Sequence, residues 1–163
     1  MKLVKGPNDG PTRTTYPRAL SNEQHTDVRL CVLIEQQVLA LISMPPVPAG
    51  GTEIPSQTPC GPVLALDRPE GALYHLIADG PPGRNNLLAS CAEMRARGFL
   101  YFAGRDTESA RNAAPVRDLM GIVLAAIQLA QRPGEETTAC RTPPGTAVVA
   151  ATNALSQDLG FQA

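Results

Sequence analysis

Hydrophobic residues recur at helical spacing in the segment that follows Ser21. Ser21 and Gln24 fit the capping box that often begins a helix. The apolar positions after them lie three or four residues apart in most cases: Val28, Cys31, Ile34, Val38, Leu41 and Ile42. The pattern predicts a helix from Ser21 to about Ser43, ended by two prolines, Pro45 and Pro46. Its last two turns are apolar nearly all round, so we expect a central helix that is buried on more than one side.

A second apolar stripe predicts a helix from Val116 to about Gln131, with Pro115 in its first turn. Six residues form the stripe: Val116, Leu119, Met120, Val123, Ile127 and Ala130. A third, shorter helix is predicted over "LLASCAEMRARG", which has apolar residues on one side and ends at Gly98.

Strands are predicted in two places. The runs "PVLAL" and "ALYHLI" flank "DRPEG", which has the composition of a longer hairpin loop, so we expect a β-hairpin of Val63 to Leu66 with Ala72 to Ile77. Phe99 to Phe102 is predicted as a further strand and a main anchor of the core, because it holds three of the six aromatic residues. The segment "TAVVAATNALSQDLGF" fits either a strand followed by a short helix or a single helix.

Three segments rich in proline and glycine interrupt these elements: residues 1–20, 44–62 and 132–145. The expected fold class is therefore α+β, a small mixed sheet (the hairpin plus one or two further strands) packed against three helices, with extended arms. Residues 1–20 are expected to form an N-terminal arm. Residues 21–163 are expected to form one domain, with a long connector at 44–62 and a loop at 132–145, because 163 residues fit a single domain.

Such segments contain too little apolar surface to offset the entropy of ordering them, and proline stiffens a chain that lies along a partner. We therefore expect them to bind neighbouring subunits. The candidate partner-binding residues are Pro7, Pro11, Tyr16, Pro17, Pro45, Pro46, Pro48, Ile54 and Pro55.

Charge and hydropathy narrow the classes of function. The formal net charge is −1, and only 18% of the residues are charged, so no basic face predicts nucleic-acid binding. The first residues lack the apolar region of a secretory signal, and no stretch approaches the 18 or so apolar residues that a membrane span needs. We expect a soluble chain made in the cytoplasm, with no membrane partner.

The four cysteines, Cys31, Cys60, Cys91 and Cys140, are too widely spaced for zinc knuckles or a dense disulfide scaffold, so no metal is expected. Cys31 and Cys91 lie on apolar stripes and are expected to be buried. Cys91 also lies early in a predicted helix, where a thiolate nucleophile is the alternative. Cys60 and Cys140 lie in proline-rich loops, where they either pair as a disulfide, within the chain or between subunits, or simply pack.

The candidate anion site is "GPPGRNNLL", because a glycine-rich backbone that leads into a helix exposes N–H groups, and an arginine adds a bidentate contact. Its candidate residues are Gly80, Gly83, Arg84 and Asn85. The segment lacks the ending of a P-loop, and the alternative is a plain turn with Asn85 or Asn86 as a helix cap.

Catalytic motifs are scarce. His75 and Asp79 suggest a proton-shuttling pair, although a solvated imidazole on a strand explains His75 equally simply. Asp106 and Glu108 are explained as helix-capping carboxylates. Neither a G-x-S-x-G elbow nor an H-E-x-x-H helix occurs, so we lean away from an enzyme.

Two hypotheses of function follow. The first is a non-enzymatic structural or assembly subunit that binds neighbouring subunits of the same or a different chain through its arms, for example in a virus or phage particle. The alternative is a small soluble α+β enzyme or an anion- or ligand-binding domain, with its site near Gly80 to Asn86, His75 and Cys91. Neither hypothesis calls for a cofactor.

Overall fold

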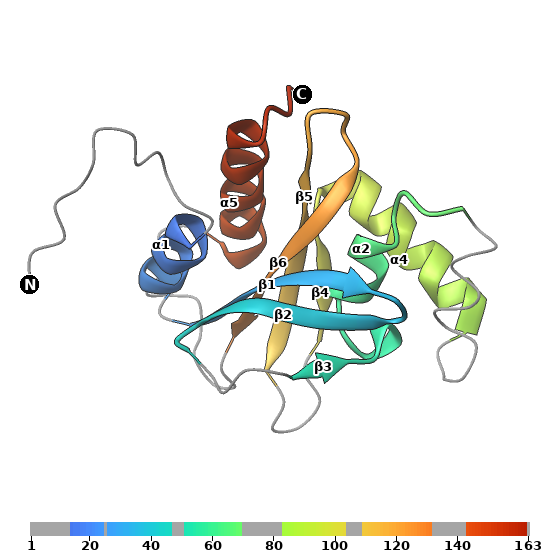
Figure 1. Cartoon of the computed structure of the whole chain (residues 1–163). Helices are drawn as coiled ribbons and strands as arrows, with labels where there is room; N and C mark the ends of the chain where they lie inside the picture. The colour runs from blue at the N-terminus through green and yellow to red at the C-terminus, as the bar shows by residue number, and fades with distance from the viewer. Residues whose placement is uncertain are drawn as a thin grey trace, which may run out of the picture.

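The computed structural model describes residues 14–24, 26–46, 51–69, 83–103, 109–131 and 143–162. Six strands form one sheet in the order β3-β2-β1-β6-β5-β4, and every neighbouring pair is antiparallel. The strands are β1 Asp27–Ile34, β2 Gln37–Met44, β3 Thr52–Glu53, β4 Leu100–Phe102, β5 Ala110–Arg117 and β6 Val123–Gln131. The sheet is strongly twisted, since β1 and β2 run steeply across the direction of β5 and β6 (Figure 1).

Helices cover both faces of this sheet. On one face lie α1 (Thr15–Gln24) and α5 (Pro144–Asp158), and on the other lie α2 (Cys60–Leu64) and α4 (Gly83–Arg97), with a short 3-10 helix, η1 (Pro55–Gln57), before α2 (Figure 1). The predicted α+β class is confirmed. The finer expectation was wrong, because within the described residues the sheet is entirely antiparallel and is covered by four α-helices.

Each face of the sheet has its own hydrophobic core. The core under α1 and α5 includes Leu20, Val28, Leu30, Val116, Ile127, Leu129, Val148 and Leu155. The core under α2 and α4 includes Cys31, Val38, Cys60, Val63, Leu64, Cys91, Met94 and Leu100. Because neighbouring residues of a strand point to opposite faces, the central strands contribute apolar residues to both cores.

The helix predicted over Ser21 to Ser43 was wrong: this segment forms the end of α1 and the β1–β2 hairpin. The apolar residues matched helical spacing because both strands carry apolar residues on both of their faces, including the exposed Ile34 and Leu41, so the alternation of polar and apolar residues is lost. The two strands are joined by a two-residue turn in which Glu35 has a φ of 55°. This turn lacks the Asn-Gly or Asp-Gly pair that usually identifies a hairpin.

The helix predicted over Val116 to Gln131 was also wrong, because this segment belongs to the β5–β6 hairpin. Asp118 forms its turn: its Oδ1 accepts hydrogen bonds from the backbone N–H groups of Met120 (2.8 Å) and Ile122 (2.9 Å). Pro115 lies within β5 rather than at a helix start. Strand β4 pairs with β5 only as far as Ala113, so Pro115 lies where β5 is paired on one side, which is where a sheet tolerates proline.

The predicted strand Val63 to Leu66 was wrong, since Val63 and Leu64 lie in α2. Its predicted partner, Ala72 to Ile77, lies outside the described residues. Residues 52–62 do not form an extended connector laid over a partner. They form β3, η1 and the start of α2, and all of α2 is buried against the chain's own sheet.

Other predictions agree with the structure. Helix α4 ends where expected, at Gly98, which has a φ of 80° and whose N–H bonds the carbonyl of Met94 at 2.8 Å. Strand β4 falls within the predicted Phe99 to Phe102. The segment left open between strand and helix is the single helix α5. The expected arm boundary at residue 20 falls inside α1, so at least its last residues are helical. None of the described helices is long and apolar enough to span a membrane.

Gly61 is required by the close approach of α2 to η1, because a Cβ at this position would lie 1.8 Å from the carbonyl oxygen of Pro55. We expect Gly61→Ala to lower the free energy of unfolding by about 2–3 kcal/mol, as overpacking does in a tight core. Urea unfolding measures it. Gly51→Ala is the control, since a Cβ there meets nothing within 4 Å, and its effect should stay below about 1 kcal/mol. Equal effects of both substitutions would contradict this account of the α2 packing.

Candidate functional site

Glu53 connects strands that lie far apart in the sheet. Its Oε1 atom is 3.5 Å from Nη1 of Arg29 on β1 and 3.5 Å from Nη1 of Arg111 on β5. Strand β3 is four strands away from β5, and in a flat sheet that separation would be roughly 19 Å. The sheet therefore curls, and the face that carries these three side chains is its concave face.

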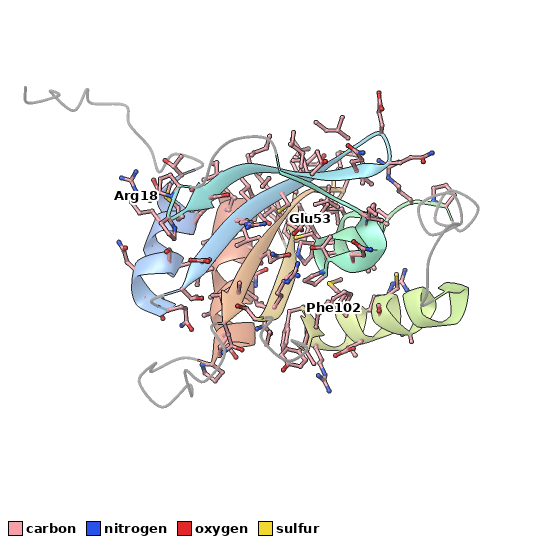
Figure 2. The ribbon with its side chains drawn as sticks, turned by 90° about the horizontal axis from the view of Figure 1, so that it is seen from below. Arg18, Glu53 and Phe102 are labelled. Carbon is pink, nitrogen blue, oxygen red and sulfur yellow. The ribbon has the colours of Figure 1, made fainter. Side chains whose placement is uncertain are left out.

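Strand pairing shows what else lies on this face. Directly opposed residues of antiparallel strands point to the same side: Arg29 pairs with Gln128 on β6, and Arg111 pairs with Phe102 on β4. Figure 2 shows Glu53 near the middle of the sheet, with Phe102 toward α4, whereas Arg18 lies on α1 at the other end of the molecule. We call Arg29, Glu53 and Arg111 the charged cluster.

A buried polar junction lies beside the charged cluster. The Thr58 hydroxyl donates a hydrogen bond of 2.8 Å to Oε1 of Gln128, and the Cys60 thiol donates to the same oxygen at 3.5 Å. The Cys60 backbone N–H in turn donates to the Thr58 hydroxyl at 3.3 Å. The side chain of Gln128, which lies directly opposite Arg29, thus fixes the start of α2 on the middle of the sheet.

The Cys60 thiol is held in its protonated form. A hydrogen bond with Cys31 is the largest cause, and burial and the nearby charge of Glu53 add to it, so that the pKa of Cys60 lies well above its usual value. Burial likewise raises the pKa of Cys91, against a smaller lowering effect of Arg95. Because the thiolate is the nucleophile, neither thiol is activated for nucleophilic attack.

The charged cluster favours an anion. Two guanidinium groups share one carboxylate, which leaves one surplus positive charge, and the three side chains are only 25–35% exposed. Metal binding is not indicated, since the described residues contain no group of three or more His, Cys, Asp or Glu side chains placed to hold an ion.

The sequence-predicted anion site is only partly visible. Gly83, Arg84, Asn85 and Asn86 belong to the first turn of α4, and the structure describes only their backbone. Gly80, His75, Asp79, Asp106 and Glu108 lie outside the described residues. Cys91 is a buried, free thiol, as expected, and so is Cys31. The ligand role of Gly80 to Asn85 therefore stays a prediction.

Cys60 was expected in a loop, but it is a fully buried free thiol at the start of α2. It therefore forms no disulfide within this chain, and its predicted partner Cys140 lies outside the described residues. A small apolar side chain suits this position because α2 packs into the core of the concave face.

Several residues expected to bind a partner contact their own domain instead. Pro17 and Pro55 are buried, and Tyr16 donates a hydrogen bond to the Asp158 carboxylate of α5, which raises the pKa of Tyr16. Pro45, Pro46 and Ile54 are exposed, so their role as partner contacts stays a prediction. Pro7, Pro11 and Pro48 lie outside the described residues.

The charged cluster was not predicted from the sequence, since none of its three members was a candidate site residue. A signal was present: Arg29 interrupts the apolar run "DVRLCVLI", and Arg111 is the second residue of "ARNAAPVR". An arginine within an apolar run is informative only once the run is assigned to a strand.

Solved structures define the class of fold: it is that of the C-terminal domains of IclR-type transcriptional regulators. A domain of a regulator assigned to the IclR family matches with a TM-score of 0.79 and 18% identity, over 92% of this chain and 95% of that one. The C-terminal domain of the Escherichia coli regulator KdgR matches with a TM-score of 0.73 and 17% identity, over 91% and 96%.

The Agobacterium tumefaciens repressor BlcR matches with a TM-score of 0.74 and 23% identity, over 88% of this chain. The chain spans only 63% of the length of BlcR. No protein-family model and no curated protein sequence matches this chain. At these identities the comparisons establish the fold.

These findings overturn the assembly-subunit hypothesis. The fold is that of domains from regulators rather than of a virion component, and the described part of the connector packs on its own sheet. The alternative hypothesis of a small ligand-binding domain fits better, although the charged cluster lies elsewhere than in the segment first considered. The matches to regulators agree with the expectation that leaned away from an enzyme.

We expect Gln128→Leu to lower the free energy of unfolding by about 2 kcal/mol, because it leaves the buried Thr58 hydroxyl without its acceptor. Urea unfolding measures the change. Gln131→Leu on the same strand is the control, since Gln131 is half-buried at the strand end, and its effect should stay within about 0.5 kcal/mol. A Gln128→Leu chain as stable as the wild type would contradict the role of the polar junction.

The raised pKa of Cys60 predicts a pH dependence of stability. Below the usual thiol value of 9.0 both the folded and the unfolded chain keep the proton, and stability is at its full value. As the pH rises above that value, the unfolded chain releases the proton first. The free energy of unfolding therefore decreases with pH until the pH reaches the raised pKa of the folded chain. Urea unfolding from about pH 7 to pH 10 should show this fall, with a shallower slope in Cys60→Ala. An unchanged slope would contradict it.

Proposed function

We propose that this chain is the effector-sensing domain of a transcriptional regulator, with a small molecule bound on the concave face of the sheet at the charged cluster. The likeness to the KdgR C-terminal domain, which this chain covers to 96%, supports a domain-level correspondence. BlcR is described as a repressor, and the proposal extends that type of role to this chain.

The observation that carries the proposal is the difference between the two faces of the sheet. On the α1–α5 face the buried residues of the central strands carry no charge, and all but Asn112 are apolar: Val28, Leu30, Ala114, Val116, Ile127 and Leu129. On the concave face the same strands also carry Arg29, Arg111 and Gln128. Charged side chains on the inside of a curled sheet have no part in packing the core, and binding explains them.

The proposal assigns DNA contact to another part of the regulator. A net charge of −1 provides no basic face for the phosphate backbone. Action together with other subunits and a cytoplasmic location, both expected from the sequence, are parts of this proposal.

A thermal-shift screen of the purified chain tests the proposal, with a library that contains neutral, cationic and anionic molecules of metabolite size. We expect at least one compound to raise the midpoint of unfolding, because a ligand that binds only the folded state stabilises it. We expect the Arg111→Gln chain to lose this response and the Arg18→Gln chain to keep it, since Arg18 lies on α1, away from the cluster (Figure 2).

The same chain should not retard a DNA fragment in a gel-shift assay at physiological salt. No stabilising compound in the library, or a response that Arg111→Gln leaves intact, would contradict the sensing site placed here.

A further inference from the structure

Cys60 is a buried thiol to which the proposed ligand site gives no role, and a second thiol lies beside it. A hydrogen bond between the Cys60 and Cys31 thiols is the largest cause of the raised pKa of Cys60. Cys31 lies on the central strand β1 and Cys60 at the start of α2, and these two elements contact each other. Both residues belong to the core of the concave face, where Cys31 is 1% and Cys60 0% exposed. Both thiols are free in the structure, which is therefore the reduced state of the pair.

We propose that Cys31 and Cys60 are an oxidative modification site, at which hydrogen peroxide converts the two thiols into an intrachain disulfide that fixes α2 covalently to β1. This inference goes beyond the sensing function proposed above and depends on no ligand. It also pairs Cys60 with a different cysteine from the one considered in the sequence.

The strand pairing makes room for the two sulfur atoms. Cys31 lies directly opposite Ala40 on β2 and directly opposite Ala126 on β6. Because directly opposed residues of antiparallel strands point to the same face, Cys31 has only a methyl group beside it on either strand. Helix α2 can therefore approach the sheet closely at this position. A disulfide requires such an approach, since it spans only roughly 4.4–6.8 Å between the two Cα atoms.

Oxidation leaves no member of the polar junction without a hydrogen bond. Oε1 of Gln128 accepts one hydrogen bond from the Cys60 thiol at 3.5 Å and a shorter one from the Thr58 hydroxyl at 2.8 Å. A disulfide removes the thiol donor and leaves the shorter bond in place. The Thr58 hydroxyl also continues to accept the backbone N–H of Cys60. Since an unpaired buried polar group would destabilise the oxidised chain, the second donor to Gln128 makes the disulfide compatible with this core.

Cys91 provides an internal comparison. It is buried in the same core as the pair and is also a free thiol. The raised pKa of Cys91 is caused by burial, against a smaller lowering effect of Arg95, and no thiol contributes to it. We therefore expect Cys91 to remain a thiol when the pair is oxidised.

The reaction consumes one peroxide and needs no other reactant. The thiolate of one cysteine attacks an oxygen of hydrogen peroxide, so that an S–O bond forms and the O–O bond breaks. The products are a sulfenic acid and hydroxide, which the proton from the thiol converts into water. The sulfur of the second cysteine then attacks the sulfenic sulfur, the S–S bond forms, and the hydroxyl group leaves as water with the second thiol proton. Each sulfur gives up one electron, and the peroxide takes up both.

Burial selects the oxidant and sets the pace of the reaction. A small neutral molecule such as hydrogen peroxide can reach a buried thiol, whereas oxidised glutathione is a bulky, charged disulfide and cannot reach it in the folded chain. The thiolate is the reacting form, and the pKa of Cys60 lies well above its usual value. We therefore expect a slow reaction that records sustained oxidation.

Peptide mass mapping of the whole chain after treatment with hydrogen peroxide tests the proposal. The treated chain is unfolded, its remaining thiols are alkylated, and it is digested without reductant. We expect the peptides of Cys31 and Cys60 to be joined, with a mass about 2 Da below that of the two free peptides, and Cys91 to be alkylated. Oxidised glutathione should give this link only when urea is present.

Urea unfolding measures whether the disulfide fixes α2. The link closes the segment from residue 31 to residue 60, which contains β2, β3 and η1, and so removes freedom from the unfolded chain. We expect the midpoint of the oxidised chain to lie about 1 M higher in urea than that of the same sample after reduction with dithiothreitol. This comparison excludes effects of methionine oxidation, because dithiothreitol reverses only the disulfide.

The variants assign the link to the two cysteines. Cys31→Ala and Cys60→Ala should each form no disulfide and lose the difference in midpoint. Cys91→Ala and Cys140→Ala should keep both. If a variant unfolds, the map of the wild-type chain still identifies the linked cysteines.

Four results would overturn the proposal: a disulfide that contains Cys91 or Cys140, a disulfide between two chains, peroxide treatment that leaves Cys31 and Cys60 unlinked, or a midpoint that the link does not raise.

Discussion

The rest of the structure depends on one constraint: a single curled sheet must bury side chains on both of its faces. Strand β6 shows how the sequence satisfies it. Ile127 and Leu129 point into the core under α1 and α5, whereas Ala126 and Gln128 point to the concave face. The alanine leaves room for α2, and the glutamine supplies the acceptor that Thr58 needs inside that core. This division gives the domain one face that is mostly apolar and one face on which buried polar groups are already paired. The charged cluster can therefore lie beside the core under α2 and α4 without leaving the buried Thr58 hydroxyl unpaired.

How much of the fold could be predicted depends on whether an element has one exposed side. Helix α4 ends at Gly98 as predicted, and β4 lies in the aromatic segment expected to be a strand. The two long hairpins were misread as helices because their strands carry apolar residues on both faces, some of them exposed, such as Leu41 and Leu124, which removes the alternation by which a strand is recognised. Alanine adds to the error in "VLAAIQLAQ", since it favours helices in isolation and is used here for close packing against α2. The tertiary structure overrides both local signals.

The candidate site was less accessible to prediction than the fold. Glu53 lies 24 residues from Arg29 and 58 residues from Arg111, and only the curl of the sheet brings the three together. The curl in turn requires the correct strand order, which the misassigned hairpins concealed. Gln128 was hidden for the same reason, because on a helix it would have been an ordinary polar position. The burial of Cys31 and Cys91 was predictable, since it depends on local apolar context alone.

The central claim is that a small-molecule ligand binds on the concave face of the sheet, at the charged cluster, and not between the sheet and helices α1 and α5. A crystal structure of the chain with a compound that stabilises it in the thermal-shift screen tests this claim most directly. We expect the compound to contact Arg29 and Arg111 on the concave face. A compound bound between α1 and α5 would contradict the claim.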